Sequence, residues 1–234
     1  MTDEAPVTGH ALPPPTVEDL RTTSRLAPAQ RRFLAHFAES GLQRRFYLAG
    51  GAALTAGYLA HRSVDDLDLF GPDPVPIQKL LPMMKALPDL ESLQWLLPRD
   101  RTTFLVTWRD KSQVKVEYRQ FPFAHIHPPW SVGSFYIASL PDLLADKIAA
   151  LTERRYPLDR CDILLALEQL EGLTFDVGIT LAERKFDLPK ALGKTAYERM
   201  SAPLSTIPER LHEAQHVEAL IEEWLALHGP PIDV

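Results

Sequence analysis

Two carboxylates that could bind a divalent metal follow two glycines that could bind a phosphate. Gly50 and Gly51 come first, and Asp66 and Asp68 begin fifteen residues after Gly51. A glycine turn at a helix N-terminus presents unpaired N–H groups and the positive end of the helix dipole, which favour phosphate. Side chains two apart on a strand point the same way, so both aspartates are predicted to share one face. These four residues together indicate metal-dependent nucleotidyl transfer.

Three short elements must position these residues. Residues 46–49 are predicted to form a strand, 52–60 a helix and 64–70 a second strand. At about 6–7 Å the two carboxylates would repel by roughly 2–3 kcal/mol at an effective dielectric near 20. Bound Mg²⁺ would offset this repulsion, because it takes one or two carboxylates together with substrate phosphates. The alternative is an acidic strand end whose side chains face water.

Two charged residues further along the chain could join this site. Glu117 lies in a predicted strand over residues 114–118, and beside the aspartates it could serve as a third metal ligand or as a general base. Its alternative is a solvated residue on an edge strand. Lys147 falls inside the apolar stripe of a predicted helix, where a lysine is unusual unless paired or functional. It could neutralise a triphosphate, or its ammonium could reach solvent along the helix flank.

A second charged group follows that helix. Asp159 and Asp162 are three apart and are predicted to face inward from the first turns of the next helix. Capping and dipole compensation explain one of these acids better than two. Arg154 and Arg155 precede them and could grip a phosphate or lie on a solvated loop. Arg62 could pair with an aspartate of the first site or contact the nucleotide.

Composition narrows the class of protein. The chain has 234 residues, 45% of them hydrophobic, which suffices for one large or two small packed domains. Its net charge of −6 argues against attraction of nucleic acid over the whole surface but permits a local basic patch. The lone Cys161 excludes an internal disulfide framework and a cysteine-rich zinc site. No apolar run reaches the ~18 residues that span a bilayer, and with no secretory signal pattern we expect a cytoplasmic protein without membrane contact.

The sequence changes character along its length. Residues 1–15 are proline-rich and are predicted to form a flexible arm. Residues 16–138 are predicted to form an α/β nucleotidyltransferase domain, with further strands at 93–97 and 102–108. A strong helix start at Ser139 begins a helical domain over 139–234 that is expected to contribute to the active site.

With these residues in place, the chain resembles the AbiEii/AbiGii-type nucleotidyltransferase toxins, a branch of the polymerase-β-like superfamily. The resemblance covers a glycine motif, an arginine leading into an Asp-x-Asp strand, a lysine helix and an Arg…Asp-x-x-Asp segment. These segments are residues 48–54, 61–70, 142–151 and 155–164. The chain departs from the family at Val64, where a hydroxyl is usual, and at Leu158, where a lysine is common. The departures affect details of nucleotide contact and leave the metal pair intact.

The resemblance implies an α+β fold: a polymerase-β-like nucleotidyltransferase core with a mixed sheet and flanking helices, then a mainly helical C-terminal region. Asp66 and Asp68 would hold Mg²⁺, or Mn²⁺, bound to a nucleoside triphosphate, and Asp159, together with Glu117, would activate the acceptor hydroxyl. The residues expected to contact the nucleotide are Gly50, Gly51, Arg62, Lys147 and Arg155.

The resemblance also implies a biological role. The acceptor would be RNA, with the 3′ end of transfer RNA as one target, and a separately encoded antitoxin would restrain the enzyme in a toxin–antitoxin or phage-defence system. Two alternatives stay open. One is a nucleotidyltransferase for small molecules of the aminoglycoside kind, which the acidic net charge favours slightly. The other is a catalytically inactive relative that only binds nucleotide.

Overall fold

The computed structural model describes most of the chain as two compact units, one spanning Pro14–Ser139 and the other containing Leu140–Val234. The described residues are 15–97, 101–154, 156–170, 172–188, 192–202, 208, 211 and 214–228. Most of the predicted N-terminal arm, residues 1–14, lies outside them, so its flexibility stays a prediction. Pro15 is described, and it is buried close to Gly57.

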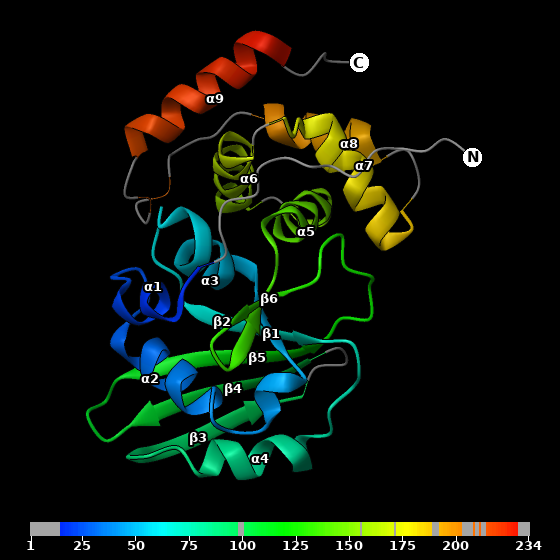
Figure 1. Cartoon of the computed structure of the whole chain (residues 1–234). Helices are drawn as coiled ribbons and strands as arrows, with labels where there is room; N and C mark the ends of the chain where they lie inside the picture. Colours follow the sequence, from blue (N-terminus) through cyan, green and yellow to red (C-terminus); the bar gives the residue numbers. More distant parts are fainter. Residues whose placement is uncertain are drawn as a thin grey trace. The chain divides into compact units, whose positions relative to one another are not determined.

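The described part of the first unit is built on a seven-stranded mixed sheet (Figure 1). Its strand order is β3-β4-β5-β2-β1-β7-β6. The central strand β2 runs parallel to β5 and antiparallel to β1, and β1 runs parallel to β7. The strands are β1 (Tyr47–Ala49), β2 (Asp66–Gly71), β3 (Leu90–Leu96), β4 (Arg101–Trp108), β5 (Gln113–Gln120), β6 (Trp130–Val132) and β7 (Phe135–Ile137).

Alternation of buried and half-buried residues along β4 and β5 gives the sheet one apolar face. Helices α2 (Pro28–Phe37) and α4 (Ile77–Lys85) cover that face. Tyr118 shows the packing, since its ring lies 6.4 Å from Phe37 and its hydroxyl lies 3.9 Å from the Met84 sulfur. Charged and half-buried side chains of β2, β4 and β5 are therefore left on the opposite face.

Short helical segments complete the first unit. Helix α1 (Val17–Thr22) begins with a capping box between Thr16 and Asp19. Segment η1 (Leu42–Arg44) leads into β1, and α3 (Gly50–Leu54) follows it. The sequence predicts one α-helix over 52–60, but the chain widens into a π turn, η2 (Thr55–Leu59), in which the N–H of Ala60 bonds the carbonyl of Thr55. The π turn ends at Ala60 in the left-handed conformation.

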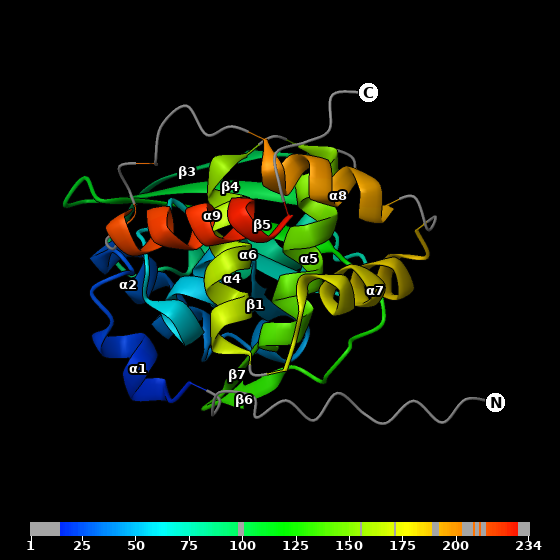
Figure 2. The same ribbon diagram turned by 90° about the horizontal axis from the view of Figure 1, so that it is seen from above.

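The second unit is a packed set of helices, seen best in Figure 2. Helix α5 contacts α6, α7 and α8, while α9 contacts α6 and α8. A Cβ on Gly178 would come within 2.7 Å of Ile148, so this glycine allows α7 to approach α5 closely. The bounds are α5 (Leu140–Glu153), α6 (Pro157–Gln169), α7 (Phe175–Phe186), α8 (Leu192–Ser201) and α9 (Ala214–His228).

The predicted α+β class is confirmed: a mixed sheet with flanking helices precedes a helical C-terminal region. Pro82 does not interrupt its helix, because α4 continues through it to Lys85. Within the described residues, none of the helices combines the length and the apolar character that crossing a bilayer requires.

Candidate active site

Asp66 and Asp68 occupy one face of β2 and are both half-buried, while Leu67 and Leu69 between and after them are fully buried on the other face. Register fixes their neighbours on β5. Asp66 is paired with Lys115, and Asp68 is paired with Glu117. Two rows of charged side chains therefore lie across the open face of the sheet.

The glycine turn meets this face directly at Asp68. Ala49, the last residue of β1, is the cross-strand partner of Asp68. The next residue, Gly50, therefore lies close to the Asp68 carboxylate. Gly50 has a φ of +60°, and a Cβ on it would collide with Asp68 Oδ2. A side chain at this position is excluded both by the backbone conformation and by the carboxylate.

Gly51 makes a similar close approach to Arg62. A Cβ on Gly51 would collide with the end of the Arg62 guanidinium, which is almost fully buried and donates a hydrogen bond to the carbonyl of Ser63. The structure thus brings together Gly50, Gly51, Arg62 and Asp68. Both glycines are needed for space, and the backbone of the turn lies against one carboxylate and one guanidinium.

Lys115 is a member of the site that the sequence did not indicate. Its ammonium lies 3.1 Å from Asp66 Oδ2 and 2.6 Å from Glu117 Oε1. Burial alone would lower the pKa of Lys115, but the hydrogen bonds to Glu117 and Asp66 and their charges raise it. Because a protein cation already offsets part of the predicted repulsion, the carboxylate pair does not by itself require a metal. The contact between Gly50 and Asp68 is the more specific indication of a site.

The oxygen donors of Asp66 and Asp68 fit a hard divalent cation. Mg²⁺ and Mn²⁺ prefer carboxylate oxygen, and Mg²⁺ takes one or two carboxylates and completes its shell with substrate phosphates and water. The glycine turn brings backbone close to the Asp68 carboxylate, where such phosphates would have to bind. In the part of the chain that the structure describes, no cluster of three or more His, Cys, Asp or Glu side chains is arranged to hold a metal. Glu117 bonds Lys115 and lies 3.7 Å from Arg101, so its role as a third ligand stays a prediction.

The other predicted site residues lie in the second unit, where Lys147 is held by two acids. Its ammonium lies 2.7 Å from Asp159 Oδ1 and 2.7 Å from Asp162 Oδ2, and neither carboxylate is exposed. Arg154 adds two hydrogen bonds to the carboxylate of Asp159, at 2.8 and 3.1 Å. The two aspartates face inward, and Lys147 is paired rather than extended along the helix flank.

The environment of Lys147 keeps it charged. Burial alone would lower the pKa of Lys147, but the charges of Asp162 and Asp159 and the hydrogen bonds with them outweigh burial and raise it. Arg155, which was predicted to contact the nucleotide, lies outside the described residues. The catalytic roles of Lys147 and Asp159 stay predictions, because their pairing is equally consistent with a structural network.

A second buried network on α5 was not anticipated from the sequence. Lys185 of α7 lies 2.8 Å from Asp142 and 2.6 Å from Asp146, and both Lys185 and Asp142 are almost completely inaccessible to solvent. Asp142 and Asp146 are four residues apart, so they lie on one face of α5. The spacing was visible in the sequence, but its partner lies 39 residues beyond Asp146 and could not be assigned from spacing alone.

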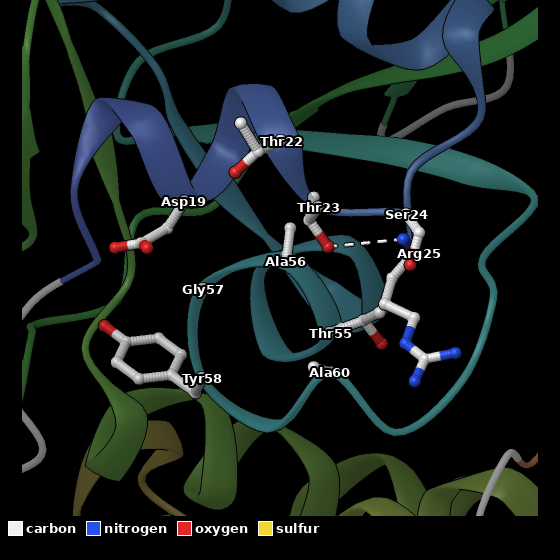
Figure 3. Close-up of a pocket in the computed structure, with 10 residues that line it drawn as sticks. All are labelled: Asp19, Thr22, Thr23, Ser24, Arg25, Thr55, Ala56, Gly57, Tyr58 and Ala60. Carbon is white, nitrogen blue, oxygen red and sulfur yellow. Dashed lines mark hydrogen bonds between the residues drawn. The ribbon is translucent and has the colours of Figure 1, made fainter.

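A polar cavity of about 490 Å³ lies elsewhere on the first unit, between the end of α1 with its following loop and the π turn η2 (Figure 3). Its walls include Thr22, Thr55 and Tyr58, and they contain none of the predicted site residues. Asp19, which also lines it, caps α1 through Thr16. The cavity is therefore separate from the Gly50–Asp68 contact.

Comparison with known proteins identifies the family. The model of the family described as nucleotidyl transferase AbiEii toxin, type IV toxin–antitoxin system, matches residues 32–229. The chain belongs to the AbiEii family. This AbiEii protein is accordingly a nucleotidyltransferase, and the resemblance stated from its motifs is confirmed. No curated protein matches its sequence.

The AbiEii chain is similar to several solved structures. JHP933 from Helicobacter pylori is similar over 84% of this chain and 90% of its own, with 17% identity and a TM-score of 0.53. The Megavirus polyadenylate synthase is similar over 65% of this chain and 34% of its own, with 11% identity and a TM-score of 0.44. At these identities the likeness to JHP933 supports the fold and says nothing further of substrates.

Proposed function

We propose that this AbiEii-family protein transfers a nucleoside monophosphate from a nucleoside triphosphate to a hydroxyl of RNA, with the 3′ end of transfer RNA as the candidate acceptor. The observation that carries the proposal is the contact of the Gly50 backbone with the Asp68 carboxylate. This contact supports the proposal because glycine turns suit phosphate and carboxylate pairs suit Mg²⁺. Catalysis of this kind consists mainly of positioning and charge stabilisation.

The proposed transfer exchanges one phosphorus–oxygen bond for another. The acceptor oxygen bonds the α-phosphorus, the bond from that phosphorus to the bridging oxygen breaks, and pyrophosphate leaves with the electron pair. The hydroxyl proton passes to a base. Asp66 and Asp68 would hold Mg²⁺, which when bound would supply positive charge to stabilise the phosphoryl oxygens. Gly50 and Gly51 shape the turn that orients the phosphates, and Arg62 beside Gly51 adds positive charge to it.

Asp159 is the predicted base, with Glu117 as the second carboxylate in that role. Both oxygens of Asp159 already accept hydrogen bonds, from Lys147 and Arg154. To receive a proton, Asp159 would have to exchange one of these partners. In Glu117, Lys115 lies 2.6 Å from Oε1, and Arg101 lies 3.7 Å from Oε2. Lys147 is proposed to offset triphosphate charge, and losing it would then affect nucleotide affinity as well as folding.

The charge of the sheet face favours RNA over an aminoglycoside. Arg101 and Arg119 are cross-strand partners on the face that carries Glu117. Two guanidinium groups beside the proposed reaction centre attract a phosphate backbone and repel a polycationic acceptor. A separately encoded antitoxin is part of the same proposal and is supported by the family's type IV toxin–antitoxin description. A cytoplasmic location, where RNA and nucleotides occur, is also part of the proposal.

The central test uses the purified chain, Mg²⁺, total RNA and each of the four labelled nucleoside triphosphates. Wild type is expected to transfer label to RNA, whereas Asp66→Ala and Asp68→Asn should abolish transfer because each removes a metal ligand. Asp65→Asn is the matched control, since Asp65 is exposed and lies just before β2. Transfer that persists in Asp66→Ala, or label that reaches aminoglycosides and not RNA, would refute the proposal.

The role of Lys147 needs a separate test, because Lys147→Met leaves two buried carboxylates short of a cation. Breaking such a pair is expected to cost about 3–5 kcal/mol of folding stability. Lys147→Arg keeps the charge and serves as the comparison. If Lys147 acts on the triphosphate, Lys147→Arg should remain folded by circular dichroism and still raise KM for the nucleotide. An unchanged KM and kcat in a folded Lys147→Arg would assign Lys147 to structure alone.

A further inference from the structure

A row of cross-strand partners on the open face of the sheet lies one step from the carboxylates. Its members sit side by side on β7, β1, β2, β5 and β4. We name it the aromatic–arginine row, and it consists of Tyr136, Tyr47, Phe70, Arg119 and Arg101. Phe70 is two residues after Asp68 on the same strand, so the row and the carboxylate face the same side, about 7 Å apart.

A second layer of aromatic rings covers the middle of the row. The ring of Phe121 stacks on Phe70 at 4.6 Å, and Phe123 packs edge-on against Phe121 at 4.9 Å. The imidazole of His125 lies 5.0 Å from the ring of Tyr47. Phe123 is 38% exposed and His125 is exposed, whereas Tyr47 and Phe70 beneath them are buried. The layer thus presents exposed rings above a buried aromatic base.

The arginines give the other end of the row its charge. The guanidinium of Arg119 lies over the ring of Phe70, 6.0 Å from the ring centroid, so its charge is next to the aromatic layer. Arg101, its partner on β4, has a side chain that is 38% exposed. Single-stranded nucleic acid is bound by this combination of cations that follow the backbone and aromatic rings that stack the bases.

The arginine end of the row lies on the side from which an acceptor must come. The glycine turn lies on the β1 side of Asp68, and Glu117 with the arginines lies on the β5 side. In-line displacement places the leaving pyrophosphate and the incoming oxygen on opposite sides of the transferred phosphorus. With the leaving group at the glycines, the acceptor approaches over β5, where Arg101 and Arg119 stand.

We propose that the aromatic–arginine row, with Phe123 and His125, is the acceptor subsite and binds the single-stranded end of an RNA. Arg101 and Arg119 contact its phosphates, and the exposed rings of Phe123 and His125 stack on its bases. The inference rests on the proposed nucleotidyl transfer for its role, but binding to this surface requires neither metal nor nucleotide. It therefore has a readout that is independent of activity.

The test measures the affinity of the full-length chain for a labelled single-stranded RNA oligonucleotide by fluorescence anisotropy, in EDTA and without nucleotide. Phe123→Ala is expected to weaken binding about tenfold, as loss of one base–aromatic stack does. His125→Ala tests the same layer from a second exposed position and keeps the test valid should Phe123→Ala misfold. Arg101→Ala should weaken binding most at low salt.

Two controls each remove one exposed side chain of the same kind, an aromatic ring or a cation, from the other face. Trp130→Ala removes a 36%-exposed ring whose partner, Ile137, is buried on the covered face. Lys85→Ala removes an exposed cation from α4, which packs on that face. Both should bind RNA as wild type does. If Trp130→Ala and Phe123→Ala lose RNA affinity equally, the aromatic layer has no specific role in RNA binding.

Other outcomes separate this inference from the proposed function. Unchanged binding in Phe123→Ala and His125→Ala would overturn the subsite, even if Asp66-dependent transfer to RNA is observed. Blunt duplex RNA that binds as tightly as the single strand, or an aminoglycoside that displaces the RNA, would also overturn it. RNA binding that requires Phe123 without transfer of any nucleotide would support the surface and refute the proposed reaction.

Discussion

Gly50 is proposed to matter both for stability, through its left-handed backbone conformation, and for activity, through its contact with Asp68. Two glycine substitutions can separate these effects. Gly50→Ala is expected to lose about 1–2 kcal/mol of stability, because alanine resists the left-handed conformation, and to lose transfer activity, because its Cβ displaces Asp68. Gly41→Ala is the matched control: Gly41 has a φ of +79°, and a Cβ added there would meet no atom within 4 Å. Thermal unfolding and labelled transfer measure the two effects.

Both glycine variants should lose stability, Gly50→Ala at least as much as Gly41→Ala because its Cβ also collides with Asp68, and only Gly50→Ala should lose transfer activity. Equal activity of Gly50→Ala and Gly41→Ala would show that the position of Asp68 does not matter for the reaction. Gly51→Ala is expected to have a smaller effect than Gly50→Ala. Its Cβ would meet the far end of the flexible Arg62 side chain, and its φ lies outside the left-handed region.

Residue spacing predicted the contacts within one strand of the site but not the contacts between strands that are distant in sequence. The shared face of Asp66 and Asp68 follows from the two-residue period of a strand, and both lie on that face. The bridge from Lys115 to Asp66 depends on the register of β5 against β2, which are 49 positions apart at this pair. Nothing in a single sequence fixes that register, so the cation between the carboxylates was not predicted.

At the scale of elements, the turn between β4 and β5 offers a test by pH. The carboxylate of Asp110 accepts hydrogen bonds from the hydroxyl and backbone N–H of Ser112 and from Arg32. The Ser112 hydroxyl contributes most, and together these bonds lower the pKa of Asp110 to about 2. The unfolded value is about 3.9. The ionised Asp110 carboxylate therefore stabilises the folded state above pH ~3.9, and this contribution is lost as the pH falls towards 2.

Thermal unfolding of Asp110→Ala against wild type checks this sign. The variant should unfold at a lower temperature at pH 6, and the difference should shrink at pH 2, because acid removes the same contacts from wild type. Comparing the two proteins at each pH cancels the protonation of other carboxylates. A difference that stays constant or grows on acidification would contradict the assignment.

Strands with several periods of pattern were predicted, whereas of the three-residue strands β1 was predicted and β6 and β7 were not. The strands around 102–108 and 114–118 alternate over many residues, and β4 and β5 contain them. Strands β6 and β7 have three residues each, too few to show a period. The π turn at Thr55–Leu59 was read as ordinary helix, because its extra residue per turn leaves no mark in an apolar segment. Because β7 was not predicted, Tyr136 could be assigned to the aromatic–arginine row only from the structure.

At the scale of the whole molecule, net charge and local charge act in opposite directions on RNA. The chain carries a net charge of −6, so its surface as a whole repels a polyanion. Attraction must come from a restricted area. The aromatic–arginine row offers two cations for phosphate contact, with stacking as the other source of affinity.

This balance predicts a weak dependence of RNA affinity on salt. Each phosphate neutralised on a single strand contributes about −0.7 to the slope of log affinity against log salt concentration, so two arginines give a slope near −1.4. Arg101→Ala should halve that slope to about −0.7, whereas Phe123→Ala should lower the affinity at every salt concentration and leave the slope unchanged. Anisotropy titrations from low to physiological salt measure both quantities. A wild-type slope steeper than about −4 would require many more phosphate contacts than this face can supply, and it would place the RNA on a different and larger surface.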